Sequence, residues 1–137
     1  MFLIDTNVVS ELRKGKKAND GVRAFWQRTD PVALFISVVT IGELRRGVEN
    51  LRARGDLPQA RQLEAWLDEV LTDYAERILD FDRDCAQIWG KLMSPHAQHP
   101  LDKQIAAIAL LYDLTVVTRN TADYAGTGVK LLNPFSS

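Results

Sequence analysis

Polar side chains that could do chemistry follow directly after the first apolar segment of the chain. Residues 2–4 are Phe-Leu-Ile, and Asp5, Thr6 and Asn7 come next. In an open parallel α/β sheet, ligands bind just beyond the carboxyl ends of the strands, so Asp5 is the leading site candidate. The structural alternative is that Asp5 caps the helix expected to follow it. Thr6 and Asn7 are candidates either for that cap or for a supporting polar shell around Asp5.

Three further acids stand near the ends of apolar segments. Glu43 comes shortly after residues 35–37, Asp102 opens an apolar helix, and Asp123 follows the strand candidate 115–118. Carboxylates that converge on one sheet edge repel each other, so such a cluster predicts a bound divalent cation. Each acid alone also has an ordinary interpretation, because acids are favoured in the first turn of a helix and in polar loops.

Other chemical signatures are weaker. His96 and His99 are three residues apart and could form a zinc site on a helix, but Pro95 and Pro100 interrupt any helix there and no third histidine accompanies them. We interpret both as surface residues. Cys85 is the single cysteine and is expected to be a small core residue. The sequence has no Gly-rich phosphate loop, no Gly-x-Ser-x-Gly elbow and no Cys-x-x-Cys motif.

The elements that would position the acids alternate between short apolar strands and amphipathic helices. This alternation is typical of an α/β protein with a central, mostly parallel sheet flanked by helices. Strands are expected at residues 2–4, 34–37, 78–79, 115–118 and, as an edge strand, 130–132. Helices are expected from Asp5 to about Gly15, over 20–28, from about 40, around 63–71, from Asp82 to about Ser94, and from Pro100.

Composition indicates an ordinary soluble, cytoplasmic protein. The 137 residues suit one domain, with 46% hydrophobic and 26% charged residues. One cysteine permits no internal disulfide, and we expect neither a signal peptide nor a membrane span. The net charge of −1 conceals a stretch rich in Arg and Lys over residues 13–61 and an acidic stretch over 76–84. The basic stretch would suit a polyanion, but on charge alone we favour the interpretation as an ordinary solvated helix surface.

Four segments, in this order, resemble the PIN-domain ribonucleases and most closely the VapC-type toxins of bacterial toxin–antitoxin pairs. They are residues 4–12 (IDTNVVSEL), 37–44 (SVVTIGEL), 101–107 (LDKQIAA) and 117–124 (VTRNTADY). Together they span almost the whole chain, so residues 1–137 are interpreted as a single PIN domain.

The resemblance implies a metal-dependent endoribonuclease. Asp5, Glu43 and Asp102 would be the core acids and Asp123 the fourth, and together they would bind Mg²⁺ or Mn²⁺ and cleave single-stranded RNA. The resemblance also implies neutralisation by a cognate VapB-like antitoxin, a homodimer, contact with DNA only through the antitoxin, and no contact with membranes.

Three neighbouring positions receive a role only through the same resemblance. Thr118 and Asn120 lie where the family keeps small polar residues near the metal. Lys103 places a cation where many relatives have a neutral residue, and its role is left open between an RNA contact and none.

Other functions fit less well. A phosphatase of the haloacid-dehalogenase type needs a second Asp two residues after the first, and Asn7 stands there. A receiver domain needs a Lys after a late strand, whereas Lys103 precedes the strand at 115–118. A catalytically silent PIN-like module that binds RNA or protein would have no reason to retain four acids.

Overall fold

Five parallel strands form the centre of the computed structural model, which describes residues 1–136. The strand order is β3-β2-β1-β4-β5, so β1 (Phe2–Ile4) pairs with β2 (Leu34–Ser37) and β4 (Thr115–Val117). The edges are β3 (Ile78–Leu79) and β5 (Lys130–Leu132). The parallel sheet and the edge position of residues 130–132 are confirmed, and β4 ends one residue earlier than predicted.

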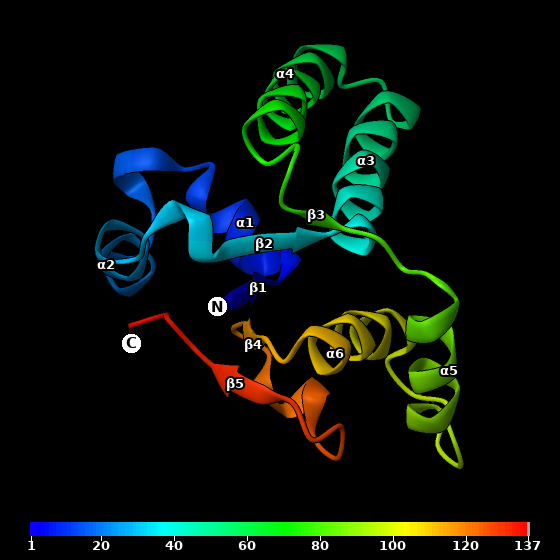
Figure 1. The fold of residues 1–137 in the computed structure, drawn as a ribbon. Helices are drawn as coiled ribbons and strands as arrows, with labels where there is room; N and C mark the ends of the chain where they lie inside the picture. Colours follow the sequence, from blue (N-terminus) through cyan, green and yellow to red (C-terminus); the bar gives the residue numbers. More distant parts are fainter. Residues whose placement is uncertain (137) are drawn as a thin grey trace.

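Helices connect and cover the strands (Figure 1). The α-helices are α1 (Thr6–Leu12), α2 (Asp20–Arg28), α3 (Val38–Ala53), α4 (Leu57–Asp73), α5 (Arg83–Leu92) and α6 (Pro100–Tyr112). Short 3-10 helices are η1 (Gly15–Lys17), η2 (Pro31–Ala33) and η3 (Thr121–Tyr124). None of the helices of residues 1–136 has the length and hydropathy needed to cross a membrane.

Capping residues explain where the helices begin. The predicted starts of α5 after Asp82 and of α6 at Pro100 are confirmed. Two other helices begin earlier than predicted. Helix α3 begins at Val38 rather than near residue 40, because the Ser37 hydroxyl accepts a hydrogen bond from the Thr40 N–H at 3.1 Å. Helix α4 begins at Leu57, ahead of the expected range 63–71, because Asp56 caps it through the Gln59 N–H at 3.2 Å.

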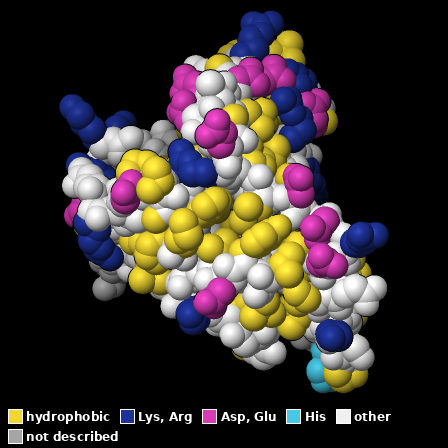
Figure 2. All heavy atoms as spheres, in the orientation of Figure 1, with side chains coloured by type: hydrophobic (Ala, Val, Ile, Leu, Met, Phe, Trp, Pro, Cys, Tyr) yellow, Lys and Arg dark blue, Asp and Glu magenta, His cyan; other side chains and the backbone are white. Residues whose placement is uncertain are grey.

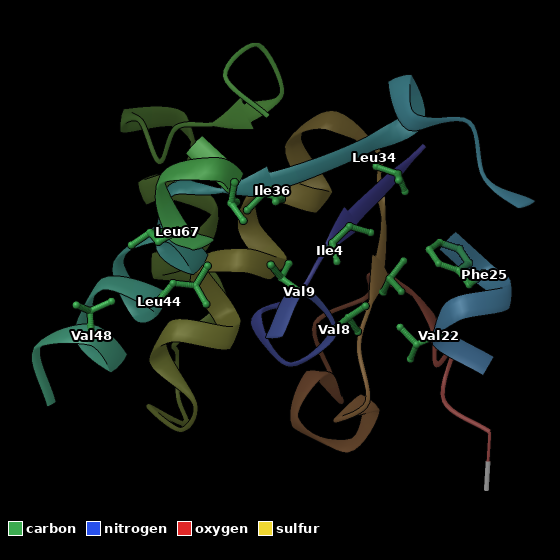
Figure 3. Close-up of a cluster of buried hydrophobic side chains, with 12 residues drawn as sticks. Ile4, Val8, Val9, Val22, Phe25, Leu34, Ile36, Leu44, Val48 and Leu67 are labelled. Atoms are coloured by element: carbon green, nitrogen blue, oxygen red, sulfur yellow. The ribbon is translucent and has the colours of Figure 1, made fainter. Parts of the chain in front are cut away.

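The hydrophobic core has two halves, one on each face of the sheet. Successive strand residues point to opposite faces, so Ile4 packs in one half and its neighbour Leu3 in the other. Figure 3 shows the first half, in which Ile4 lies near Val8 and Val9 of α1. The second half contains the buried Cys85, as expected for a small core residue. Burial of both faces holds the carboxyl ends of the strands in fixed positions.

Helices α3 and α4 form a hairpin that stands away from the sheet (Figure 1). Glu64 of α4 pairs with Arg52 at 2.5 Å and Arg45 at 2.6 Å, and hydrogen bonds from Arg52 and then Arg45 lower the pKa of Glu64 to about 2. Figure 2 shows acidic and basic side chains interspersed over this hairpin. Two arginines of the basic stretch at residues 13–61, Arg45 and Arg52, are therefore paired within the molecule.

Candidate functional site

Asp5 lies immediately after β1 and is buried, with 3% of its surface exposed. The register of the central strands pairs Ile4 with Val117 and so brings Thr118 beside Asp5. The Asp5 Oδ2 atom accepts hydrogen bonds from the Thr118 hydroxyl at 2.8 Å and the Tyr124 hydroxyl at 3.0 Å. Its Oδ1 atom accepts the Thr6 N–H at 2.8 Å. Asp5 therefore caps α1 and also stands at the carboxyl edge of the sheet.

Asn7 and Thr118 tie α1 to the loop that follows β4. The Asn7 amide donates to the Thr118 hydroxyl at 3.2 Å and to Asp5 Oδ2 at 3.3 Å. The Asn7 carbonyl oxygen accepts the Arg119 N–H at 3.0 Å. Asn120 contributes its backbone N–H to Thr118 Oγ1 at 3.1 Å. Asn7 and Thr118 of the predicted polar shell therefore fix the orientation of the Asp5 carboxylate.

Glu43 reaches the same edge from α3. Its Oε1 atom lies 2.6 Å from the Thr6 hydroxyl, which is also 3.0 Å from the Thr40 hydroxyl. Thr6 thus links the end of β1 to α3, and it holds one oxygen of Glu43 while the other remains available for a ligand.

Asp102 and Asp123 come from α6 and η3. Burial and the negative charges of Asp5, Asp123 and Glu43, in that order, raise the pKa of Asp102 to about 6, and His99 opposes the rise. Asp102 therefore lies close enough to Asp5, Asp123 and Glu43 for their negative charges to act on its carboxyl group.

His99 stands between two of these acids, which the sequence did not reveal. Its Nδ1 atom lies 3.9 Å from Asp102 Oδ2, and its Nε2 atom lies 3.9 Å from Asp123 Oδ1. One ligand atom from each of these three residues lies within 4.8 Å of the other two. The interpretation of His99 as a surface residue was incomplete, because the ring is half-exposed yet faces the carboxylates. Its position three residues before Asp102 was the available signal.

Tyr124 and Lys103 are further residues whose roles only the structure shows. Tyr124 is 1% exposed, and burial followed by the charge of Asp5 raises the pKa of its hydroxyl, which keeps it a hydrogen-bond donor. Lys103 is also buried, and its Nζ atom donates to the His96 carbonyl at 2.8 Å. Lys103 therefore holds the loop before α6.

The donor set fits a divalent cation. Mg²⁺ and Mn²⁺ prefer carboxylate oxygens and water, and the acids converge here from β1, α3, α6 and η3. Three donors occupy Oδ2 of Asp5, whereas Oδ1 accepts the Thr6 N–H alone and retains a free lone pair. The edge of the sheet is a candidate acidic metal site.

The sheet and its acidic edge define an α/β protein of the kind that binds ligands beyond the carboxyl ends of its strands. The chain belongs to the PIN-domain family, whose profile matches residues 2–125. It is 34% identical over 142 residues to the VapC ribonuclease Y4jK of Sinorhizobium fredii, with 98% of each chain covered. It is 33% identical over 140 residues to toxin FitB of Neisseria gonorrhoeae, covering 98% of this chain and 99% of FitB.

A solved structure shares the fold over its full length. In the structure of FitAB bound to an IR36 DNA fragment, the matching chain is 29% identical to this one and superposes with a TM-score of 0.87. The match covers 100% of this chain and 97% of the other. The predicted PIN fold is therefore confirmed.

Proposed function

We propose that this chain is an endoribonuclease that hydrolyses RNA phosphodiester bonds and acts as the toxin of a toxin–antitoxin module. One observation supports this above all: the charges of Asp5, Glu43 and Asp123 all act on Asp102, and ligand atoms of Asp102 and Asp123 lie within 4.8 Å of each other. The similarity to a VapC ribonuclease and to toxin FitB supports the same assignment. The proposed single PIN domain spans residues 1–137, of which residue 137 lies outside the part that the structure describes.

The four acids are the proposed ligands of Mg²⁺ or Mn²⁺. When bound, such an ion supplies a nucleophilic water and stabilises negative charge on the phosphate. The chain supplies the geometry, because Thr118, Tyr124 and Asn7 hold the Asp5 carboxylate and Thr6 holds Glu43. This mechanism needs no histidine or lysine as a general base. The residues around the acids therefore serve mainly to orient the carboxylate oxygens.

Asp5→Asn tests the assignment of the site. The change keeps the shape of the side chain but removes a negative ligand, so we expect RNA cleavage by the purified protein to fall below detection and growth arrest on expression to disappear. Asp20→Asn is the matched control, because Asp20 is an exposed acid of α2. Circular dichroism establishes that both variants fold. Equal toxicity of Asp5→Asn and the wild type would remove Asp5 from the site.

The same preparation distinguishes the alternative functions. Metal-dependent cleavage of RNA without turnover of p-nitrophenyl phosphate supports the nuclease, whereas the reverse supports a haloacid-dehalogenase-type phosphatase. Binding of RNA with no turnover of either substrate would indicate a catalytically silent module.

The proposed partner is a VapB-like antitoxin, and the structure offers it an apolar pocket of about 540 Å³. The pocket lies between α1, α2 and α4, where Leu12, Trp26 and Trp66 contribute to its wall. Docking of the antitoxin on helices near residues 7–28 and 40–54 is the sequence-based hypothesis, and we propose that α4 takes part in place of residues 40–54, because it lines this pocket. Homodimer formation, contact with DNA only through the antitoxin, and a cytoplasmic location complete the proposal.

Co-expression tests the partner. The small open reading frame beside this gene should give a stable complex whose RNase activity is suppressed. An Arg or Lys of that partner inserted toward the four carboxylates would inhibit by charge. Replacement of its C-terminal Arg and Lys residues by Ala should then restore cleavage. Persistent inhibition after those replacements would favour steric blockage instead.

A further inference from the structure

We propose that His99 is a nitrogen ligand of the divalent-ion site and makes this site prefer Mn²⁺ to Mg²⁺. The inference rests on the proposed function, since it concerns the same metal site. The inference adds a nitrogen ligand to a set of carboxylate oxygens, and this addition changes which ion the site binds more tightly.

The spacing of the donor atoms supports this role. Both ring nitrogens lie 3.9 Å from a carboxylate oxygen, Nδ1 from Asp102 and Nε2 from Asp123, and this distance exceeds a hydrogen bond. Ligand atoms held at about 2.1 Å from one ion stand about 3.0 to 4.2 Å apart, so either of these spacings, though not both at once, suits a ring nitrogen and a carboxylate oxygen that share an ion. One ring nitrogen would bind the ion, while the N–H of the other would face the second carboxylate, a common arrangement of metal-bound histidines.

His99 is held at the start of α6 by its backbone conformation and by the contacts of its loop. His99 precedes α6 with φ at 52°, a left-handed conformation that is unfavourable for a residue with a Cβ atom. The His99 carbonyl accepts the Lys103 N–H at 3.0 Å, and the buried Lys103 side chain anchors His96 in the same loop. Unfavourable backbone conformations persist where the surroundings enforce them and cluster at functional sites.

Ligand chemistry gives the direction of the preference. Mg²⁺ takes oxygen ligands almost exclusively and keeps several waters, whereas an imidazole nitrogen is a good ligand for transition-metal ions. A site made of carboxylates alone would discriminate weakly between Mg²⁺ and Mn²⁺. Addition of the His99 nitrogen should strengthen Mn²⁺ binding and leave Mg²⁺ binding almost unchanged.

His99→Gly tests the role, because glycine adopts the left-handed conformation freely and removes the ring without strain. The full-length protein is titrated with Mn²⁺ and separately with Mg²⁺ by calorimetry, in the absence of RNA. We expect the variant to bind Mn²⁺ at least tenfold more weakly and Mg²⁺ within a factor of two of the wild type. His96→Ala is the matched control, since His96 lies in the same loop and lines the same pocket as His99 and Asp123 but is not one of the three residues whose ligand atoms cluster, and it should change neither affinity.

Pulsed electron paramagnetic resonance of bound Mn²⁺ gives a direct readout of the nitrogen. The wild type and His96→Ala should show the nitrogen coupling of a ligating imidazole, and His99→Gly should lack it. Mn²⁺ binding without that coupling in the wild type, or tighter Mn²⁺ binding by His99→Gly, would overturn the proposal while leaving the nuclease assignment intact. If the wild type binds no Mn²⁺ at all, the metal mechanism itself fails.

Discussion

At the scale of single residues, the site depends on how one carboxylate is held. Asp5 Oδ2 receives donors from α1, from the loop after β4 and from η3. Such charge-assisted hydrogen bonds fix the carboxylate before any ligand arrives. Preorganisation of this kind is what a metal ligand needs, because a misplaced oxygen weakens both ion binding and catalysis.

Tyr124→Phe removes one of these donors without changing the packed ring. We expect the free energy of unfolding to fall by about 1 kcal/mol and RNA cleavage to fall by roughly tenfold, because Asp5 loses one of its restraints. Chemical denaturation and a cleavage assay on the same preparation measure both effects. Tyr112→Phe is the control, since Tyr112 is 48% exposed and should change neither quantity. Full activity in Tyr124→Phe would show that the hydrogen bond from Tyr124 to Asp5 does not contribute to RNA cleavage.

Asp102 should make the metal-free protein less stable as the pH rises. Its pKa is about 6 in the folded chain against 3.8 for the free side chain, so the folded state binds more protons between these values. The contribution of the Asp102 carboxyl group to the free energy of unfolding is fully present below about pH 4 and is lost as the pH rises through about 6. In chelator, Asp102→Asn should match the wild type at pH 4 and exceed it at pH 7 by about 1 to 2 kcal/mol, allowing for partial exposure. Denaturant titrations at both pH values measure this difference, and equal stability at pH 7 would contradict it.

At the scale of elements, the sequence predicts what local patterns determine. The strands at 2–4 and 34–37 are short apolar runs with polar ends, and Pro100 marks the start of α6 because proline suits a first helical turn. The approach of His99 to Asp123 could not be predicted, since it depends on how the loop before α6 folds back against η3. The four acids were predicted from their positions near the ends of apolar segments and supported by a resemblance, whereas the hydrogen bond from Tyr124 to Asp5 needed the structure.

The C-terminal segment lies against the first turn of α2, and a glycine makes this contact possible. A Cβ atom at Gly21 would collide with the Pro134 carbonyl oxygen and the Ser136 nitrogen. Gly21→Ala should therefore destabilise the protein by about 1 to 3 kcal/mol, since backbone must move. A Cβ atom at Gly90 in α5 would have no neighbour within 4 Å. Gly90→Ala should therefore raise the free energy of unfolding by about 0.5 to 1 kcal/mol, as expected for a helix interior. Thermal unfolding compares the two, and equal melting temperatures would show that the segment adjusts freely.

At the scale of the whole molecule, a bound ion would join elements from opposite ends of the chain. Because the unfolded chain has no such site, binding at a hundred times the dissociation constant should add about 2.7 kcal/mol of stability, or about 10 °C in Tm. Thermal scans with and without Mn²⁺ measure the shift, and Asp5→Asn should lose most of it. An unchanged Tm in millimolar Mn²⁺, together with activity that survives chelation, would exclude the metal mechanism.

The central position of β1 also determines when the protein becomes active during its own synthesis. Its neighbour β4 and the acids of α6 and η3 are encoded more than 90 residues later, so a nascent chain holds Asp5 without its partners. At typical translation rates, the stretch from Asp5 to Asp123 takes about 6 to 24 seconds to make. During that interval the ribosome that makes the chain is not exposed to an assembled nuclease. Order of synthesis thus delays activity until α6 and η3 have both been made.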